Sequence, residues 1–165
     1  MKIGFTMTEG RGELDRVLAD VAERAGAEGL RTCGIVQINT ERPGTARCDM
    51  DVRILPGGPD IRISQSLGPE ATGCRLDPDG LETAVAEVGR RMEAGFDVFI
   101  LNKFGKQEAE GRGFREMIGR ALEQGASVIA GTNGTNRTAF EEFAGGMAEN
   151  LPPDPESIVD WLLGE

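Results

Sequence analysis

Residues 99–114 read FILNKFGKQEAEGRGF, an apolar run followed by a polar segment, and the elements predicted on either side are arranged around it. Its first residues, with Val98 before them, form an apolar run that is typical of a buried parallel strand. From Asn102 onward the chain turns polar and rich in glycine. Ligands of open α/β sheets bind beyond the carboxyl ends of the strands. The stretch therefore predicts either a binding site or a solvated loop, and its residue types alone leave both open.

The composition is that of a globular protein in which 28% of the residues are charged and 5% are aromatic. Its 165 residues fit one domain, residues 1–165, with room for a hydrophobic core. No apolar run approaches the ~20 residues of a membrane span, and the N-terminus has no signal-peptide core. We therefore expect a cytoplasmic protein without membrane contact. A formal net charge of −10 argues against nucleic-acid binding, which needs a basic surface.

Two residue types limit the chemistry that the chain can perform. It has no histidine, which excludes Ser-His-Asp triads and imidazole metal sites. Its three cysteines, Cys33, Cys48 and Cys74, have no CxxC spacing, so we expect no metal site.

Apolar periodicity on both sides of residues 99–114 predicts alternating strands and helices. Strand–helix–strand units of this kind imply parallel pairing, so the chain is predicted to form a three-layer α/β domain with a mostly parallel sheet. The predicted elements are strand 2–6, helix 14–25, strand 32–38, loop 39–46, a β-hairpin at 52–64, helix 78–94, strand 96–101, helix 114–122, strand 126–130, helix 140–147 and a closing helix 157–163, with Trp161 docked on the core.

The β-hairpin is predicted from apolar alternation on both sides of Pro56-Gly57-Gly58-Pro59, and it forms an insertion over about residues 47–76. Arg53 and Arg62 fall on its polar face. They either lie opposite each other around an anion or pair with nearby aspartates. The irregular stretch 65–80 that follows is long for a compact domain, and such loops are often functional.

Three polar loops follow predicted strands and are expected to converge: residues 6–12, 102–113 and 131–136. The first is placed like a phosphate loop, but the pattern G-x-x-x-x-G-K-[ST] is absent. If Gly12 ends the loop, Glu13 stands where the phosphate-binding lysine belongs. If Gly10 ends it, Arg11 supplies a charge but Gly12 offers no hydroxyl group for magnesium.

Residues 100–114 with the following REMIGRAL are similar to the Walker B region of small P-loop nucleoside triphosphatases, whose acidic pair falls on Asn102 and Lys103. The whole chain resembles an uncharacterised bacterial family that is related to those enzymes and often linked with molybdenum uptake. The resemblance implies a P-loop NTPase-like fold with altered Walker motifs. It is carried by Ile35-Val36-Gln37, Ile61–Gln65, Gly73–Asp77, Leu101–Glu108 and Phe143–Gly146.

Walker B acids hold magnesium and orient water, and an amide with a lysine in their place favours anions instead. We therefore expect a non-hydrolytic protein that binds an oxyanion or a phosphorylated ligand; a role in molybdenum supply is implied by the resemblance alone. The predicted ligand-binding residues are Gly10, Arg11, Gly12, Arg62, Ser64, Arg75, Asn102, Lys103, Lys106 and Thr132.

Two alternatives remain open. The first is a magnesium-dependent nucleoside triphosphatase in which Glu108 or Glu110 holds the metal and Arg11 binds phosphate. The second is a homodimeric adaptor that contacts its partner through the hairpin and residues 65–80. Fold alone does not decide among the three.

Overall fold

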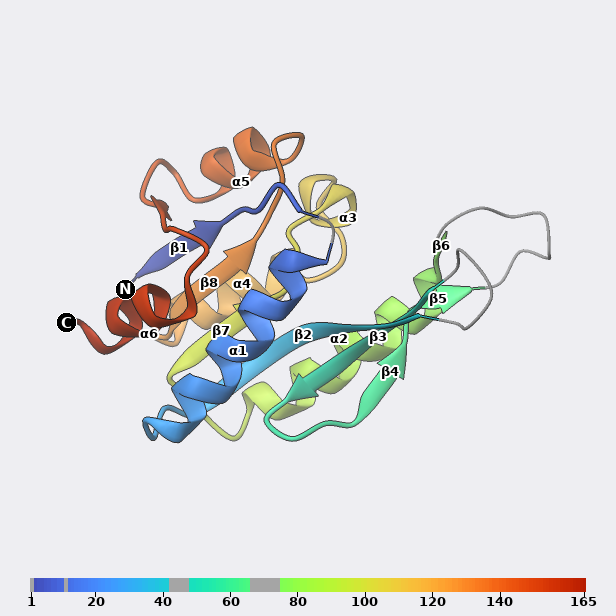
Figure 1. The fold of residues 1–165 in the computed structure, drawn as a ribbon, viewed down its shortest axis with the longest axis horizontal. Coiled ribbons are helices and arrows are strands. Elements are labelled where there is room, and N and C mark those ends of the chain that lie inside the picture. The colour runs from blue at the N-terminus through green and yellow to red at the C-terminus, as the bar shows by residue number, and fades with distance from the viewer. Residues whose placement is uncertain (1, 11, 42–47, 66–74) are drawn as a thin grey trace.

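The computed structural model describes residues 2–10, 12–41, 48–65 and 75–165, without the side chains of residues 39–41, 48, 49 and 75. These residues form a seven-stranded sheet covered by helices on both faces, together with a two-stranded sheet (Figure 1). The predicted three-layer, mostly parallel α/β arrangement is thus confirmed. The strands are β1 (Ile3–Thr6), β2 (Thr32–Glu41), β3 (Cys48–Leu55), β4 (Asp60–Arg62), β5 (Ser64–Gln65), β6 (Arg75–Leu76), β7 (Val98–Leu101), β8 (Ser127–Gly131) and β9 (Glu149–Asn150). The helices are α1 (Glu13–Ala27), α2 (Pro78–Met92), α3 (Lys106–Ala109), α4 (Arg115–Glu123), α5 (Arg137–Phe143) and α6 (Pro155–Leu163).

Strand β7 lies in the middle of the large sheet, whose order is β4-β3-β2-β7-β8-β1-β9. It pairs in parallel with β2 on one side and with β8 on the other. All four of its residues are buried. Phe99 and Leu101 join the hydrophobic cluster under α2, α4 and α5, whereas Val98 and Ile100 join the cluster under α1 and α6. A strand covered on both faces has no polar side, and this explains its uninterrupted apolar sequence.

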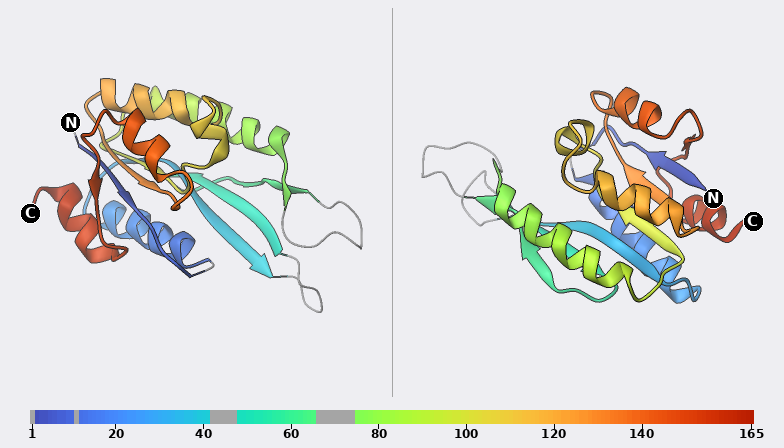
Figure 2. Two further views of the ribbon diagram at one scale, coloured as in Figure 1. Left: turned by 90° about the horizontal axis from the view of Figure 1, so that it is seen from above. Right: turned by 180° about the vertical axis from the view of Figure 1, so that it is seen from behind.

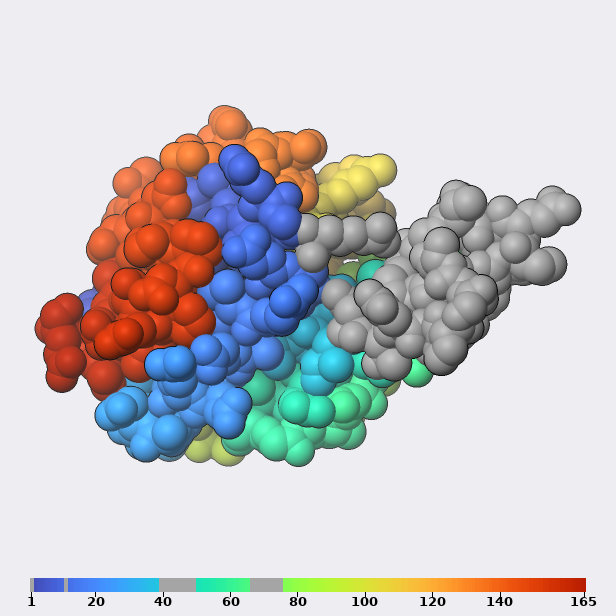
Figure 3. Space-filling model, viewed as in Figure 1, coloured from blue at the N-terminus to red at the C-terminus, as the bar shows by residue number. Residues whose placement is uncertain are grey.

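The helical layers follow from these two clusters. Figures 1 and 2 show α1 and α6 on one face of the sheet and α2 with α4 on the other. Figure 3 shows the first face, where the surface of α6 and α1 continues into the outer hairpin of β3 and β4. Among the described helices, none has the length and apolar character to cross a lipid bilayer.

The predicted hairpin forms between β3 and β4, and β3 pairs in addition with β2 from Gly34–Leu55 to Glu41–Cys48. The prediction of a loop beginning at Asn39 is therefore wrong, because residues 39–41 continue β2. Polar residues suit an antiparallel ribbon with a solvated face, so the end of the apolar run did not mark the end of the strand. Residues 42–47 of the predicted loop lie outside the described residues.

The hairpin register decides between the two interpretations of its arginines. Arg53 lies opposite Asp60, and Arg62 lies opposite Asp51. The Arg53 Nε donates to Asp60 at 2.9 Å, and Arg62 forms an ion pair with Asp51. The pairing with aspartates is thus observed, and the arrangement of two facing arginines around an anion is wrong.

Four short elements, α3, β5, β6 and β9, were not predicted. Helix α3 forms inside the expected loop after β7, and β5 at the start of the irregular stretch pairs with β6 near its end. Strand β9 adds to β1 through two exposed residues, Glu149 and Asn150. Elements of two to four residues are too short to show a hydrophobic period. Residues 66–74 of the irregular stretch lie outside the described residues.

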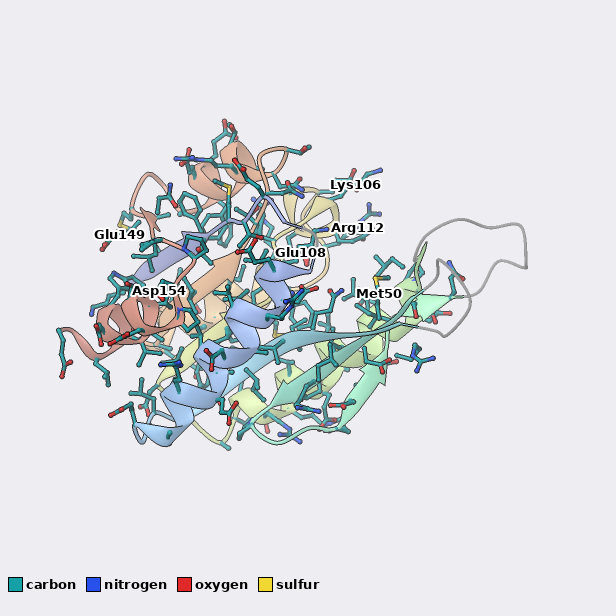
Figure 4. The ribbon with its side chains drawn as sticks, viewed as in Figure 1. Met50, Lys106, Glu108, Arg112, Glu149 and Asp154 are labelled. Atoms are coloured by element: carbon teal, nitrogen blue, oxygen red, sulfur yellow. The ribbon has the colours of Figure 1, made fainter. Side chains whose placement is uncertain are left out.

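The closing helix α6 docks on the far end of β1, as the sequence predicted. Asp154 caps it by accepting a hydrogen bond from the Ser157 N–H at 3.0 Å. The Trp161 ring packs on Gly4, where an added Cβ would come within 3.1 Å of the ring. Its Nε1 donates to the Glu149 carboxylate at 3.1 Å, and Figure 4 labels Glu149 and Asp154 at this end of the molecule.

Candidate functional site

Hydrogen bonds join the segments that follow β1, β7 and β8 at the carboxyl edge of the sheet. The Phe104 N–H donates to the Gly131 carbonyl at 2.6 Å, and the Thr132 N–H donates to the Thr6 carbonyl at 3.1 Å. The buried Thr132 hydroxyl donates to the Phe104 carbonyl at 2.9 Å. A Cβ at Gly131 would lie 2.3 Å from the Asn102 carbonyl oxygen, so this approach requires glycine. The three loops expected to converge are therefore held together by their own backbone.

A cavity of about 540 Å³ opens at this edge of the sheet. Its volume falls in the range of roughly 300–1,000 Å³ that is usual for small-molecule sites. One side is apolar and comes from β2, β3 and the start of α2. The other side is polar, and Figure 4 shows its Lys106 and Glu108 at α3, across from Met50 on β3. The principal polar lining residues are Gln37, Asn102, Lys103, Lys106, Glu108 and Thr132.

Asn102 lies at the centre of the site, immediately after β7, and is only 2% exposed. Its Oδ1 accepts a hydrogen bond from the Gln37 N–H of β2 at 2.8 Å. Its Nδ2 donates to the Asp15 carboxylate of α1 at 2.7 Å. The amide thus uses its acceptor and one donor to fix three elements, which a carboxylate at the same position could not do. Asn102 is a link between β7, β2 and α1 as well as a lining residue.

Lys103 and Lys106 bring positive charge to the cavity. The exposed Lys103 side chain passes Gly105, where an added Cβ would lie 3.7 Å from its Cε. Lys106 is the first residue of α3 and is also exposed. Both lysines line the cavity together with Gly10 and Gly12 of the first loop. The cavity therefore combines two ammonium groups with a glycine turn.

Glu108 is a carboxyl group enclosed by the protein, with an exposed fraction of 5%. Burial raises its pKa to about 7; backbone hydrogen bonds from Glu108, Gly105 and Phe114 and the charge of Lys103 act in the opposite direction. A Cβ at Gly113, which has φ of 61°, would lie 2.9 Å from its Oε1. A pKa near 7 means that a large fraction of the Glu108 carboxyl groups are protonated at neutral pH.

The turn before α1 differs from a phosphate-binding loop in its charge. Gly12 caps the helix with φ of 76°, and Glu13 and Asp15 occupy the first turn. A Cβ at Gly10 would lie 2.7 Å from the Glu13 Oε2, so this carboxylate folds back over the loop. Carboxylates at a helix N-terminus stabilise its dipole, and here they occupy the region that a bound phosphate would share. Arg11 lies outside the described residues.

The side chains at this edge do not fit a magnesium ion. Magnesium prefers octahedral oxygen ligands with one or two carboxylates. The Asn102 oxygen already accepts the Gln37 N–H, Lys103 is a cation, and Glu110 pairs with Arg112. Within residues 2–10, 12–41, 48–65 and 75–165, no group of three or more acidic or cysteine side chains is placed to hold a metal.

The structure separates some of the predicted ligand-binding residues from the others. Gly10, Gly12, Asn102, Lys103, Lys106 and Thr132 line the cavity. Arg62 is engaged with Asp51 on the outer hairpin, and the Ser64 hydroxyl accepts the Met50 N–H at 3.0 Å. Neither Arg62 nor Ser64 lines the cavity. The side chain of Arg75 lies outside the described part of the chain.

Sequence reasoning missed two polar partners of Asn102. Asp15 was assigned only to a helix, although it lies in the turn after the glycine loop, where ligands of α/β proteins gather. The second partner is the backbone N–H of Gln37, and a backbone donor leaves no signal in the residue type. The apolar lining was also missed, because its residues come from four separate elements.

Comparison with solved structures shows which known fold this chain shares. A human cancer-related nucleoside triphosphatase, solved in solution, superposes with a TM-score of 0.64 over 99% of this chain and 95% of its own, at 19% sequence identity. The fold is therefore that of a P-loop nucleoside triphosphatase.

Residues 3–161 match the family described as "Protein of unknown function (DUF2478)", and the chain belongs to this family. A segment of the molybdenum import ATP-binding protein ModC 2 of Bradyrhizobium diazoefficiens is 34% identical over 149 residues. That match covers 90% of this chain and 17% of the relative. The expected relationship to an uncharacterised family with a P-loop NTPase-like fold is thus confirmed.

The Asn102–Asp15 hydrogen bond yields a test by residue exchange. Asn102→Asp places two carboxylates in contact and removes the donor, so we expect a loss of about 1–3 kcal/mol in the free energy of unfolding. Adding Asp15→Asn restores a donor–acceptor pair and should recover most of that loss. Urea denaturation of both single variants and the double variant gives the coupling energy. Additive single effects would contradict the link.

The raised pKa of Glu108 makes a prediction for stability against pH. The folded carboxyl holds its proton up to about pH 7, whereas the unfolded one ionises near its ordinary value of 4.5. The contribution of Glu108 to the free energy of unfolding is complete below pH 4.5 and is lost as the pH rises from 4.5 through 7. The total loss is at most about 3 kcal/mol. Glu108→Gln should remove this fall, as measured by urea denaturation at several pH values relative to the unmodified protein. Glu110→Gln, an exposed neighbour, is the control and should keep the fall.

Proposed function

We propose that this chain binds a small anionic ligand, an oxyanion or a phosphorylated molecule, without hydrolysing it. The principal support is the pair of residues after the central strand. Asn102 uses its amide to connect three elements, and Lys103 places an ammonium group at the cavity edge. Lys106 adds a second positive charge, and ammonium groups bind phosphate and related oxyanions through charge-assisted hydrogen bonds.

The arrangement of carboxyl groups supports binding over hydrolysis. A nucleoside triphosphatase needs acids that hold magnesium and orient water. Glu108, one candidate for that task, is buried and has a raised pKa, and Glu110 is engaged with Arg112. Glu13 folds over the glycine turn where the phosphate-binding lysine would stand. The magnesium-dependent alternative therefore has less support than ligand binding.

The name of one relative adds candidate ligands to this proposal. That relative is described as a molybdenum import protein, and this chain spans 17% of its length. Molybdate and tungstate therefore belong among the anions to be tested, together with phosphate, pyrophosphate and nucleotides. The adaptor alternative depends in part on residues 66–74, outside the described residues. Light scattering would reveal the dimer that it requires.

Lys103 supplies the direct test of the proposal. Isothermal titration calorimetry with phosphate, pyrophosphate, sulfate, molybdate, tungstate and ATP should detect binding of at least one anion. Lys103→Gln should weaken that binding by about 10- to 100-fold, since a hydrogen bond from a charged group is lost. Arg24→Gln removes an equal charge at the other end of α1, where Arg24 pairs with Asp20, and should leave the affinity unchanged. Failure of every anion to bind at millimolar concentration would contradict the proposal.

The same preparations separate binding from hydrolysis. We expect phosphate release from ATP and GTP to stay at the level of a protein-free blank with or without magnesium, because no acidic cluster among the described residues is placed to hold the ion. Magnesium-dependent release that Glu108→Gln abolishes would instead establish the triphosphatase alternative.

A further inference from the structure

The cavity is larger than a free oxyanion requires, and its two sides differ in chemistry. Thr132, Asn102 and the two lysines lie on the polar side. The opposite side is formed by Ile35 of β2, by Met50 and Val52 of β3, and by Ile63, Leu76 and Leu81 near the start of α2. These six side chains, the apolar wall, contain no group that could bind an anion.

Three observations indicate that the apolar wall is a built surface. Ile35, Val52, Ile63 and Leu81 are between 1% and 8% exposed, so the core fixes their positions. The Met50 N–H donates to the Ser64 hydroxyl, which holds the rim of β3 against β5. The backbone of Gly80 at the start of α2 approaches β4 so closely that a Cβ would lie 2.4 Å from the Arg62 carbonyl oxygen. The strands and α2 therefore hold the wall in place.

We propose that the apolar wall binds the organic part of the ligand while Lys103 and Lys106 bind its anionic group, so that the ligand is an organic phosphate with an apolar or aromatic moiety. This inference rests on the proposed function. It follows from the juxtaposition of the two sides in one cavity of about 540 Å³. Sites of this size bind ligands mainly through apolar contacts, with a few polar groups that set their orientation.

The electrostatics of the polar side agree with this assignment. Among the described residues, Lys103 and Lys106 are the cations that line the cavity, and Asp15 and Glu108 are the carboxyl groups. Asp15 is bound to Asn102, and Glu108 is enclosed by backbone groups. Because the two lysines and the apolar wall line the same cavity, a ligand with an anionic and an apolar part can contact both.

The test compares 1-naphthyl phosphate with inorganic phosphate in calorimetric titrations of the full chain. We expect naphthyl phosphate to bind at least tenfold more tightly, because its ring leaves water for the apolar wall. Met50→Trp fills the rim of that wall and should remove the tenfold advantage while inorganic phosphate affinity stays within twofold. Leu76→Trp, on β6 in the same apolar wall, is the second variant should Met50→Trp fail to fold. Lys103→Gln should weaken both compounds.

The outcomes separate this inference from the proposed function. Equal affinity for the two compounds would overturn the amphipathic ligand and leave the anion site intact. Tight naphthyl phosphate binding that both tryptophan variants leave unchanged would overturn the assignment to the apolar wall. If neither compound nor any other anion binds, the proposed function fails together with this inference.

Discussion

The two hydrogen bonds of the Asn102 amide hold together the parts of the fold that form the cavity. One reaches the backbone of β2 and the other reaches the first turn of α1, while β7 supplies the residue itself. Because Asn102 is almost fully buried, an unpaired amide there would cost a desolvation penalty of about 1–3 kcal/mol. The carboxyl edge of the sheet is therefore organised around a neutral side chain. The side chains of Asp15, Lys103, Lys106 and Glu108 line the same cavity as the Asn102 amide.

The distribution of charge around this link is the basis for proposing an anion site on this fold. Carboxylates occupy the first turn of α1, where the fold class usually receives phosphate. Among the described residues, positive charge lines the cavity at Lys103 and Lys106, which follow β7, and β8 lies between β7 and the β1 strand that precedes that turn. The ligand's anionic group is thus expected beside β7 and α3.

The sequence predicted the parts of the fold in which local pattern and tertiary packing agree. Val98–Leu101 is apolar because helices cover both faces of β7. Each predicted helix has apolar residues along one side because that side packs on the sheet. The sequence did not predict two features, the pairing register of the hairpin and the hydrogen-bond partners of Asn102. Pairing register decides that Arg62 meets Asp51, and register depends on the whole hairpin. The partners of Asn102 lie 87 and 65 positions away along the chain, so no local pattern connects them.

The position of the only tryptophan in the chain has a spectroscopic consequence. Trp161 packs on Gly4 and bonds to Glu149, at the end of β1 opposite to the cavity. Its indole environment changes when α6 separates from the sheet, so its emission follows unfolding. Trp161 does not line the cavity, so we expect a bound ligand to leave this environment unchanged. Tryptophan fluorescence of this protein is thus expected to follow the unfolding of α6 and not to detect ligand binding in the cavity.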